Sequence, residues 1–320
     1  MATSRHQTGR TKRGTGGATS RHSASEGATR WVRWGAVLGL FVVVAGLVTA
    51  RVISAPSGTE GADPRPIARL EAPDFHSLLV DPADPDHVLF GAHSGTQESR
   101  DGGFTWEAGA LRNADAMSLA SSPEEPATIY AAGHDVFQVS RDGGQTWQPQ
   151  EHDLPGTDIH GFAQDTGDPL RLYALVVGAG LFTSGDGGAG WTPLAAQPPG
   201  GGMPIGLATG EATLYAATET GLALSRDQGV TWAALPSQPK DGVLSLAIPA
   251  SEPRTIYAGT TNGLFKSGDG GMSWRSLGPP DVPVLALAVA ASDPNRVVMV
   301  DDAGGVFRSD DGAASWRAPQ

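Results

Sequence analysis

The sequence of 320 residues contains no cysteine, so disulfide bonds and thiolate chemistry are excluded. Charged residues are also scarce, at 18% of the chain, whereas glycine and proline occur 44 and 24 times. This balance is typical of a turn-rich β protein rather than a helical one. We therefore expect a long helix in only one segment, near the N-terminus.

Basic residues are scarce over most of the chain. Residues 65–320 hold 14 Lys and Arg against 31 Asp and Glu, whereas residues 1–64 hold eight basic and three acidic residues. Binding to nucleic acid requires basic side chains that neutralise a row of phosphates. We therefore expect no nucleic-acid partner for the large C-terminal region, whose acidic charge suits a cationic partner or a metal ion.

The N-terminal segment differs from the rest in composition. Residues 1–30 are rich in Ser, Thr, Gly and Arg without apolar periodicity, which predicts a disordered cytoplasmic tail. Residues 34–50 carry no charge and follow Trp31, which predicts a transmembrane signal-anchor helix over residues 31–53. Because most basic residues precede this span, the rest of the chain is expected outside the cytoplasm in a single-pass membrane protein.

An alternative is a signal peptide cleaved after the Val-Thr-Ala of residues 48–50, which would release a secreted protein. Residues 54–70 are rich in Pro and Gly and are predicted to link the membrane segment to the domain that follows.

An octapeptide recurs six times in the remaining chain. The copies are SRDGGFTW, SRDGGQTW, SGDGGAGW, SRDQGVTW, SGDGGMSW and SDDGAASW, and successive copies lie 41 to 44 residues apart. Each interval contains short β-type runs separated by turn residues. A β-type repeat of this length predicts a propeller blade of four strands, so we expect a six-bladed, all-β propeller over residues 71–320. Residues 66–71 are expected to close the ring beside the last blade.

The octapeptide resembles the Asp-box, or BNR repeat, of sialidase-like, sortilin-like and photosystem II assembly-factor-like propellers, over about residues 75–316. In such a turn an Asp side chain accepts backbone N–H groups, a Gly takes a positive φ and a Trp packs beneath. Because six identical catalytic sites would serve no purpose, we interpret the copies as structural. Ala313 replaces a Gly in the sixth copy, which predicts a distorted turn there. The Ser, Asp and Trp positions are Ser99, Asp101, Trp106, Ser140, Asp142, Trp147, Ser184, Asp186, Trp191, Ser225, Asp227, Trp232, Ser267, Asp269, Trp274, Ser309, Asp311 and Trp316.

The resemblance to sialidases implies a Tyr nucleophile paired with Glu, an Asp acid and three Arg that clamp a carboxylate. Every Tyr of this chain instead recurs at 42- or 43-residue intervals, at Tyr130, Tyr173, Tyr215 and Tyr257. Most Arg of the domain lie in the octapeptides or in turns. The sequence therefore argues against a true sialidase. For an enzyme of this fold, a glycoside hydrolase is the expected class, with Glu219, Asp301 and Asp302 as candidate carboxylates.

Histidine is the chemically active residue that the repeat does not explain. His76 and His160 share one position, just before the first strand of repeats one and three, where repeat two has Met117. His93 and His134 share another, six residues before the octapeptide Ser, at the tip between the second and third strands. Both positions belong to the same face of a propeller, so we expect the four side chains to converge.

Neutral imidazole is a common ligand of Zn²⁺ and Cu²⁺, so His76, His93, His134 and His160 are candidate ligands for a transition metal. The alternative is that His76 and His160 replace an apolar residue while His93 and His134 decorate loops. His87 and His152 have no counterparts in other repeats and are expected to be exposed to solvent.

The prediction for function is a membrane-anchored, extracytoplasmic propeller that binds a protein, a glycan or a metal-bearing partner on its top face and serves as a binding or assembly module. A glycoside hydrolase and a metal-binding propeller are the alternatives.

Overall fold

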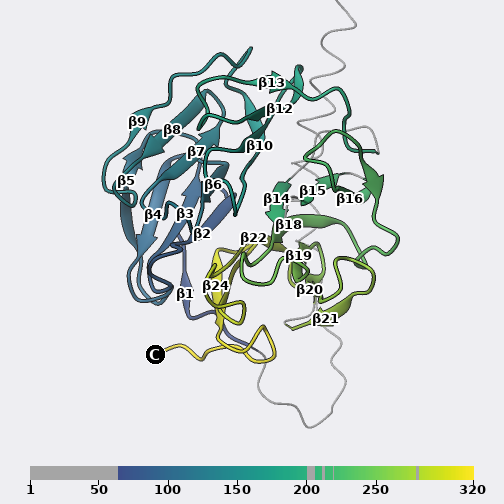
Figure 1. Cartoon of the computed structure of the whole chain (residues 1–320). Coiled ribbons are helices and arrows are strands. Elements are labelled where there is room, and N and C mark those ends of the chain that lie inside the picture. The colour runs from purple at the N-terminus through teal and green to yellow at the C-terminus, as the bar shows by residue number, and fades with distance from the viewer. Residues whose placement is uncertain (1–63, 200–205, 211–212, 219, 279–280) are drawn as a thin grey trace, which may run out of the picture. The chain divides into compact units, whose positions relative to one another are not determined.

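The computed structural model describes residues 64–199, 206–210, 213–218, 220–278 and 281–320 (Figure 1). All regular structure in these ranges is β-strand, in six antiparallel sheets of four strands each. The predicted tail and transmembrane helix lie outside the described residues. No helix within the described ranges is long and apolar enough to span a bilayer.

Each sheet is one blade, and in blades one to five the strands follow one another in sequence from the innermost to the outermost. The innermost strands are β2 (Ser77–Val80), β6 (Ser118–Ser121), β10 (Ile159–Gln164), β14 (Gly206–Gly210), β18 (Val243–Ala247) and β22 (Val284–Val289). The second strands are β3 (Val88–Ala92), β7 (Ile129–Gly133), β11 (Leu172–Val176), β15 (Thr213–Thr218), β19 (Ile256–Thr260) and β23 (Val297–Asp301). The third strands are β4 (Gly95–Ser99), β8 (Val136–Ser140), β12 (Gly180–Ser184), β16 (Gly221–Ser225), β20 (Gly263–Ser267) and β24 (Gly305–Ser309). The outermost strands are β5 (Glu107–Arg112), β9 (Gln148–Pro149), β13 (Thr192–Pro193), β17 (Ala233–Ala234), β21 (Arg275–Leu277) and, in blade six, β1 (Ala68–Arg69).

The innermost strands contact one another in the circular order β2, β6, β10, β14, β18, β22 and back to β2. The prediction of a six-bladed propeller is therefore confirmed. The second strands are buried along their whole length in blades one, two, three, five and six, because neighbouring blades pack on both of their faces. This explains their nearly continuous apolar sequences.

The ring closes through the N-terminal end of the propeller. Strand β1 pairs with β24, with Ala68 opposite Val306, and thus supplies the outermost strand of blade six. Ile67 and Leu70, on either side of β1, are buried in the core between blades six and one. The expected closure by residues 66–71 is present, and the segment predicted as a linker over residues 54–70 ends inside the propeller.

The four Tyr side chains are part of the blade construction. Each lies in a second strand and is at most 4% exposed. The hydroxyl of Tyr130 donates to the carbonyl oxygen of Gly187 at 3.1 Å, and the hydroxyl of Tyr257 donates to that of Pro294 at 3.1 Å. Burial raises the pKa of Tyr173 and Tyr257 to about 12. These phenols therefore stay protonated, and the hydroxyls of Tyr130 and Tyr257 tie neighbouring blades together.

The octapeptide forms the turn between the third and outermost strands in blades one to five, and in blade six it follows the third strand, β24. In every copy the Ser hydroxyl donates to the Asp carboxylate at 2.7–2.8 Å and accepts the backbone N–H of the fifth residue at 2.7–2.9 Å. Hydrogen bonds lower the pKa of Asp227 to about 2. The largest effect comes from the Thr231 hydroxyl, followed by the Ser225 hydroxyl and the Thr231 backbone N–H. The aspartates are thus held as anions by their own turns and act as structural acceptors.

The sixth copy corrects one expectation. Ala313 adopts a φ of 64° and donates its N–H to Ser309 Oγ at 2.9 Å, as glycine does in the other copies. Asp311 likewise accepts the N–H of Ser315 at 2.8 Å. The predicted distortion is therefore wrong, because alanine, with a single methyl group, reaches the left-handed conformation at a modest energetic cost.

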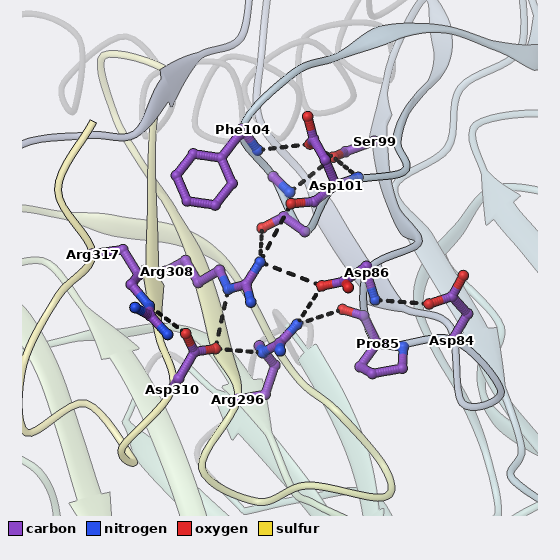
Figure 2. A network of polar contacts seen from close by, with 12 residues as sticks. Asp84, Pro85, Asp86, Ser99, Asp101, Phe104, Arg296, Arg308, Asp310 and Arg317 are labelled. Carbon is purple, nitrogen blue, oxygen red and sulfur yellow. Dashed lines mark hydrogen bonds and ion pairs between the residues drawn. The ribbon is translucent and has the colours of Figure 1, made fainter. Parts of the chain in front are cut away.

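A network of charged residues joins blade six to blade one, and Figure 2 shows it at close range. Arg308 on β24 donates through Nη1 to the carbonyl oxygens of Asp101 and Gly102 in the first octapeptide, at 3.3 Å each. Arg296 donates to Asp86 at 2.8 Å. Asp310 joins the two arginines on the blade-six side. We call this contact between the first and last blades the seam.

Asp310 is the anion at the centre of the seam. Burial opposes its ionisation, but hydrogen bonds from Arg317 and Arg308 outweigh burial and lower its pKa. Asp310 occupies the second octapeptide position, where the other copies carry Arg or Gly. Blade six therefore departs from the repeat at the blade boundary where the first and last blades meet.

Candidate functional site

Seven side chains on blades one to three form a continuous row at the opposite ends of the blades from the octapeptides. They belong to three overlapping groups of His and Asp, and within each group the nitrogen and oxygen atoms lie within 4.8 Å of one another. We call this set the histidine–aspartate row, and its members are Asp74, His76, His93, Asp115, His134, Asp158 and His160.

The first kind of position in the row is the start of an innermost strand. His76 directly precedes β2, and His160 is the second residue of β10. His160 is the extra residue of a β-bulge between Ile159 and Gly161. A bulge re-aims a side chain relative to the regular strand. Blades five and six contain the same bulge with a leucine in the corresponding position, at Leu244 and Leu285.

The second kind of position is the hairpin tip between the second and third strands. His93 lies at the β3–β4 tip and His134 at the β7–β8 tip. Gly133 precedes His134, and a Cβ atom added there would lie 2.1 Å from the carbonyl oxygen of Asp115. Only glycine lets the backbone at Asp115 approach this tip so closely, so Gly133 brings Asp115 and His134 together.

The three aspartates of the row are not among the residues predicted from the sequence. Each stands two residues before the position of His76 in its own repeat, at Asp74, Asp115 and Asp158. Asp74 accepts the backbone N–H of His93 at 2.9 Å and so ties the start of β2 to the tip of the same blade. The recurrence of these aspartates at intervals of 41 and 43 residues was a signal as regular as that of the histidines.

The blade-one end of the row consists of Asp74, His76 and His93. His76 Nε2 lies 3.3 Å from His93 Nδ1 and 3.3 Å from Asp74 Oδ1. His93 Nδ1 also contacts the second oxygen of Asp74. Three different side chains thus direct a nitrogen or oxygen atom to one point.

The blade-three end has the same composition, with His134, Asp158 and His160. His160 Nε2 lies 2.9 Å from His134 Nε2 and 3.0 Å from Asp158 Oδ1. His134 Nε2 lies 3.7 Å from the same Asp158 oxygen. Two imidazoles and one carboxylate again converge.

The centre of the row joins the two ends. Asp115 Oδ2 lies 3.3 Å from His93 Nε2 and also contacts His134 Nδ1. The His93 and His134 rings stack with their centroids 5.7 Å apart and their planes at 14°. Asp115 is 7% exposed, and its Oδ1 has no hydrogen-bond partner among the residues that the structure describes.

Electrostatics favours neutral imidazole at both ends of the row. Burial lowers the pKa of His76 and of His160, and the nearby carboxylates of Asp74 and Asp158 offset this effect only in part. A neutral ring offers a lone pair to a metal ion, whereas a protonated ring offers none. The row therefore presents four imidazoles and three carboxylates that are chemically suited to a divalent transition metal.

Two of the three candidate carboxylates for catalysis, Asp301 and Asp302, lie in the described residues. Glu219 is outside them. Asp301 is 9% exposed and accepts the backbone N–H groups of Ala303 and Gly305 at 2.9 and 2.6 Å, so it closes the β23–β24 turn. Burial, followed by the charge of Asp301, raises the pKa of Asp302. Neither Asp301 nor Asp302 belongs to the row.

The predictions for the two remaining histidines of the domain are wrong. His87 is 3% exposed, and it lies 2.9 Å from Asp81 Oδ2 through Nδ1 and 3.3 Å from Glu98 Oε2 through Nε2. His152 is half-buried, and its ring lies 5.6 Å from that of Phe137 between centroids. Both fill sites specific to one blade, which a comparison between repeats does not reveal.

No protein-family model matches the sequence, and no curated protein matches it. Among solved structures, the GH74 xyloglucanase from Xanthomonas campestris is similar with a TM-score of 0.52 and 19% identity, over 77% of this chain and 46% of that chain. The WD40 repeats of RRP9 have a TM-score of 0.51 and 11% identity, over 80% of this chain and 82% of that chain. YCF48 from Cyanidioschyzon merolae has a TM-score of 0.49 and 18% identity, over 78% of this chain and 87% of that chain.

The similarity is one of fold. At such identities it establishes the β-propeller architecture alone, and this chain spans less than half of the xyloglucanase length. Propellers of one architecture carry many unrelated functions, so the function must be argued from the residues of the site.

Proposed function

We propose that this protein is a membrane-anchored, extracytoplasmic Asp-box propeller that binds divalent transition-metal ions through the histidine–aspartate row. The observation that carries the proposal is the convergence of four imidazoles and three carboxylates on one face of blades one to three. The propeller is the binding module, and the row is its ligand-binding surface.

The distances at the blade-three end of the row support a metal site. Zinc bonds of about 2.0–2.1 Å in tetrahedral geometry place neighbouring ligand atoms about 3.3 Å apart. The separations between ligand atoms at the blade-three end are 2.9, 3.0 and 3.7 Å. A cation bound between these atoms would stabilise three side chains that all direct a lone pair to one point.

The departures from the repeat also favour binding at the row. The blade framework accounts for the octapeptides and the four Tyr, whereas His76 and His160 occupy a position that is leucine in blades five and six. A buried or half-buried polar group is costly unless it is paired, so replacing leucine by histidine twice needs a compensating interaction. Asp74 and Asp158 supply part of it, and a metal ion bound by the same atoms would add to it.

The test is the metal content of the full chain, purified without a polyhistidine tag, loaded with Zn²⁺ and dialysed. We expect bound zinc by elemental analysis, and its loss in the double variant His93→Ala, His134→Ala, which removes a ligand from each of the three overlapping groups. His152→Ala, outside the row, is the matched control and should bind as the parent does. A parent chain without bound zinc contradicts the proposal.

The cellular placement rests on the uncharged residues 34–50 and on the basic residues that precede them. Protease added to intact cells should digest the propeller and spare the N-terminal tail. Protection of the propeller would refute the extracytoplasmic placement, and recovery of the propeller in the medium would favour a cleaved signal peptide.

The Asp-box assignment rests on six copies of the octapeptide that share one hydrogen-bond pattern. An enzymatic role as a glycoside hydrolase would require turnover of fluorogenic glycosides or sialosides. Turnover that Glu219→Gln abolishes would replace the binding function proposed here with catalysis.

A further inference from the structure

Resting on the proposed metal binding, we infer that the row holds two metal ions, one at each end, and that Asp115 serves both by accepting a hydrogen bond from each of the two central histidines. The site is thus a pair of metal sites whose central histidines share one carboxylate, Asp115, as their hydrogen-bond acceptor. Each ion takes one carboxylate and two imidazoles.

The ring nitrogens are already divided between the two ends. At the blade-one end, His93 presents Nδ1 toward His76 and Asp74. At the blade-three end, His134 presents Nε2 toward His160 and Asp158. Neither end uses a nitrogen that the other end needs, so both can be filled at once.

The nitrogens left over face Asp115. His93 Nε2 lies 3.3 Å from Asp115 Oδ2, and His134 Nδ1 contacts the same oxygen. An imidazole that binds a metal through one nitrogen keeps its proton on the other, and that N–H usually donates to a carboxylate. Asp115 meets this requirement for both rings simultaneously.

A third ion at the centre is disfavoured by the same chemistry. It would have to bind His93 Nε2 and His134 Nδ1, so both rings would bridge two metals and both would lose their remaining proton. With the ends filled, the ring protons stay in place and Asp115 keeps its role as acceptor. The negative charge of Asp115, which is buried, then lies between two cations and offsets their repulsion.

Each end also has an open coordination position. Two imidazoles and one carboxylate supply three ligands, whereas tetrahedral zinc takes four, and sites with three protein ligands bind water or an exogenous group in the fourth position. The side chains of His93 and His134 are 45% exposed, so the ions would be reached from solvent. The ligand in the fourth position would be water or another oxygen or nitrogen donor from solution.

The experiment is a calorimetric titration of Zn²⁺ into the tag-free full chain and four variants. His76→Leu removes a ligand from the blade-one end only, and His160→Leu from the blade-three end only. Leucine is the natural occupant of this position in blades five and six, so the strands should keep their geometry. We expect two Zn²⁺ per parent chain, one for each single variant and none for the double variant.

Asp115→Asn tests whether Asp115 is a hydrogen-bond acceptor for the two histidines or is itself a metal ligand. We expect this variant still to bind two Zn²⁺, each about 10–100-fold more weakly, as is typical when the carboxylate partner of a ligating histidine is lost. Thermal unfolding in EDTA should show that all variants are folded before the titration is interpreted.

The failures are distinguishable. One Zn²⁺ per parent chain, abolished by Asp115→Asn and retained in both leucine variants, would place a single ion at the centre and overturn the dinuclear inference while metal binding stands. Three Zn²⁺ per chain would overturn it in favour of rings that bridge adjacent ions. Absence of binding in the parent would overturn the proposed function itself.

Discussion

Replacing Arg308 by Met should loosen the seam between blades six and one. Arg308 is 8% exposed and has Asp86, Asp101 and Gly102 on blade one as partners, as well as Asp310 on its own blade. Methionine retains most of the packing of the aliphatic part but removes the guanidinium. The carbonyl oxygens of the first octapeptide and the carboxylate of Asp310 then lose a charged donor.

The expected cost follows from the exposure of each partner. A hydrogen bond to a charged group contributes about 1.5–3 kcal/mol, and a fully buried ion pair broken on one side costs about 3–5 kcal/mol. Asp86 is 53% exposed, so water replaces part of its interaction, and Asp310 retains Arg296 and Arg317. We therefore expect Arg308→Met to lower the free energy of unfolding by about 2–4 kcal/mol.

The matched control is Arg317→Met. The Arg317 side chain is 58% exposed and contacts the same Asp310, so its loss should cost less than about 1 kcal/mol. In a domain of this size each kcal/mol shifts the Tm by about 2–4 °C, so Arg308→Met should lower the Tm by about 4–16 °C. Calorimetry and urea unfolding followed by fluorescence measure both changes. Equal Tm values for the two variants would refute a seam held by Arg308.

Three further predictions concern single residues. The hydrogen bond from His87 to Asp81 is the main cause that raises the pKa of His87. The contribution of His87 to stability is therefore complete below about pH 6.5 and is lost as the pH rises through the raised pKa. The urea midpoints of the parent and of His87→Gln should converge toward high pH, and a difference that stays constant contradicts this. Gly133→Ala should disrupt the approach of Asp115 to the hairpin tip and weaken both Zn²⁺ binding and stability. The control is Gly143→Ala, because Gly143 has a φ of 72° and open space around its Cβ position. This control should lower the free energy of unfolding by only about 1–2 kcal/mol and leave Zn²⁺ binding, measured by calorimetry, unchanged. Gln228 is exposed, has a φ of 60° and occupies a position that is Gly in the other octapeptides. Gln228→Gly should therefore raise the free energy of unfolding by about 0.5–1 kcal/mol. A lower urea midpoint for this variant would show that the left-handed conformation of Gln228 carries no strain.

The repeat made the architecture predictable because its interactions are local. Within each octapeptide the Ser side chain bonds to the Asp and to the fifth residue, and the Asp bonds to the seventh residue. All these bonds join residues at most four positions apart, so the same letters give the same turn wherever they occur. The error at Ala313 has a physical origin, since the hydrogen bonds of the turn hold alanine in a conformation that its own preference disfavours.

The positions of the histidines also followed from the repeat, because equivalent residues of neighbouring blades lie on one face. Nothing in the periodicity identified which nitrogen of each ring faces which neighbour. That division depends on the rotation of the side chains and on the approach of Asp115 to the tip of blade two, which Gly133 permits.

The sequence by itself determined the six-bladed fold, the octapeptide turns and the face on which the histidines lie, because these depend on interactions within one repeat and on its regular spacing. Only the tertiary structure decided the burial of His87, the seam around Arg308 and the partition of His93 and His134 between two ends of the row. Each of these depends on contacts that a single blade forms with its neighbours or on substitutions in one repeat, and a pattern common to all repeats carries no information about them.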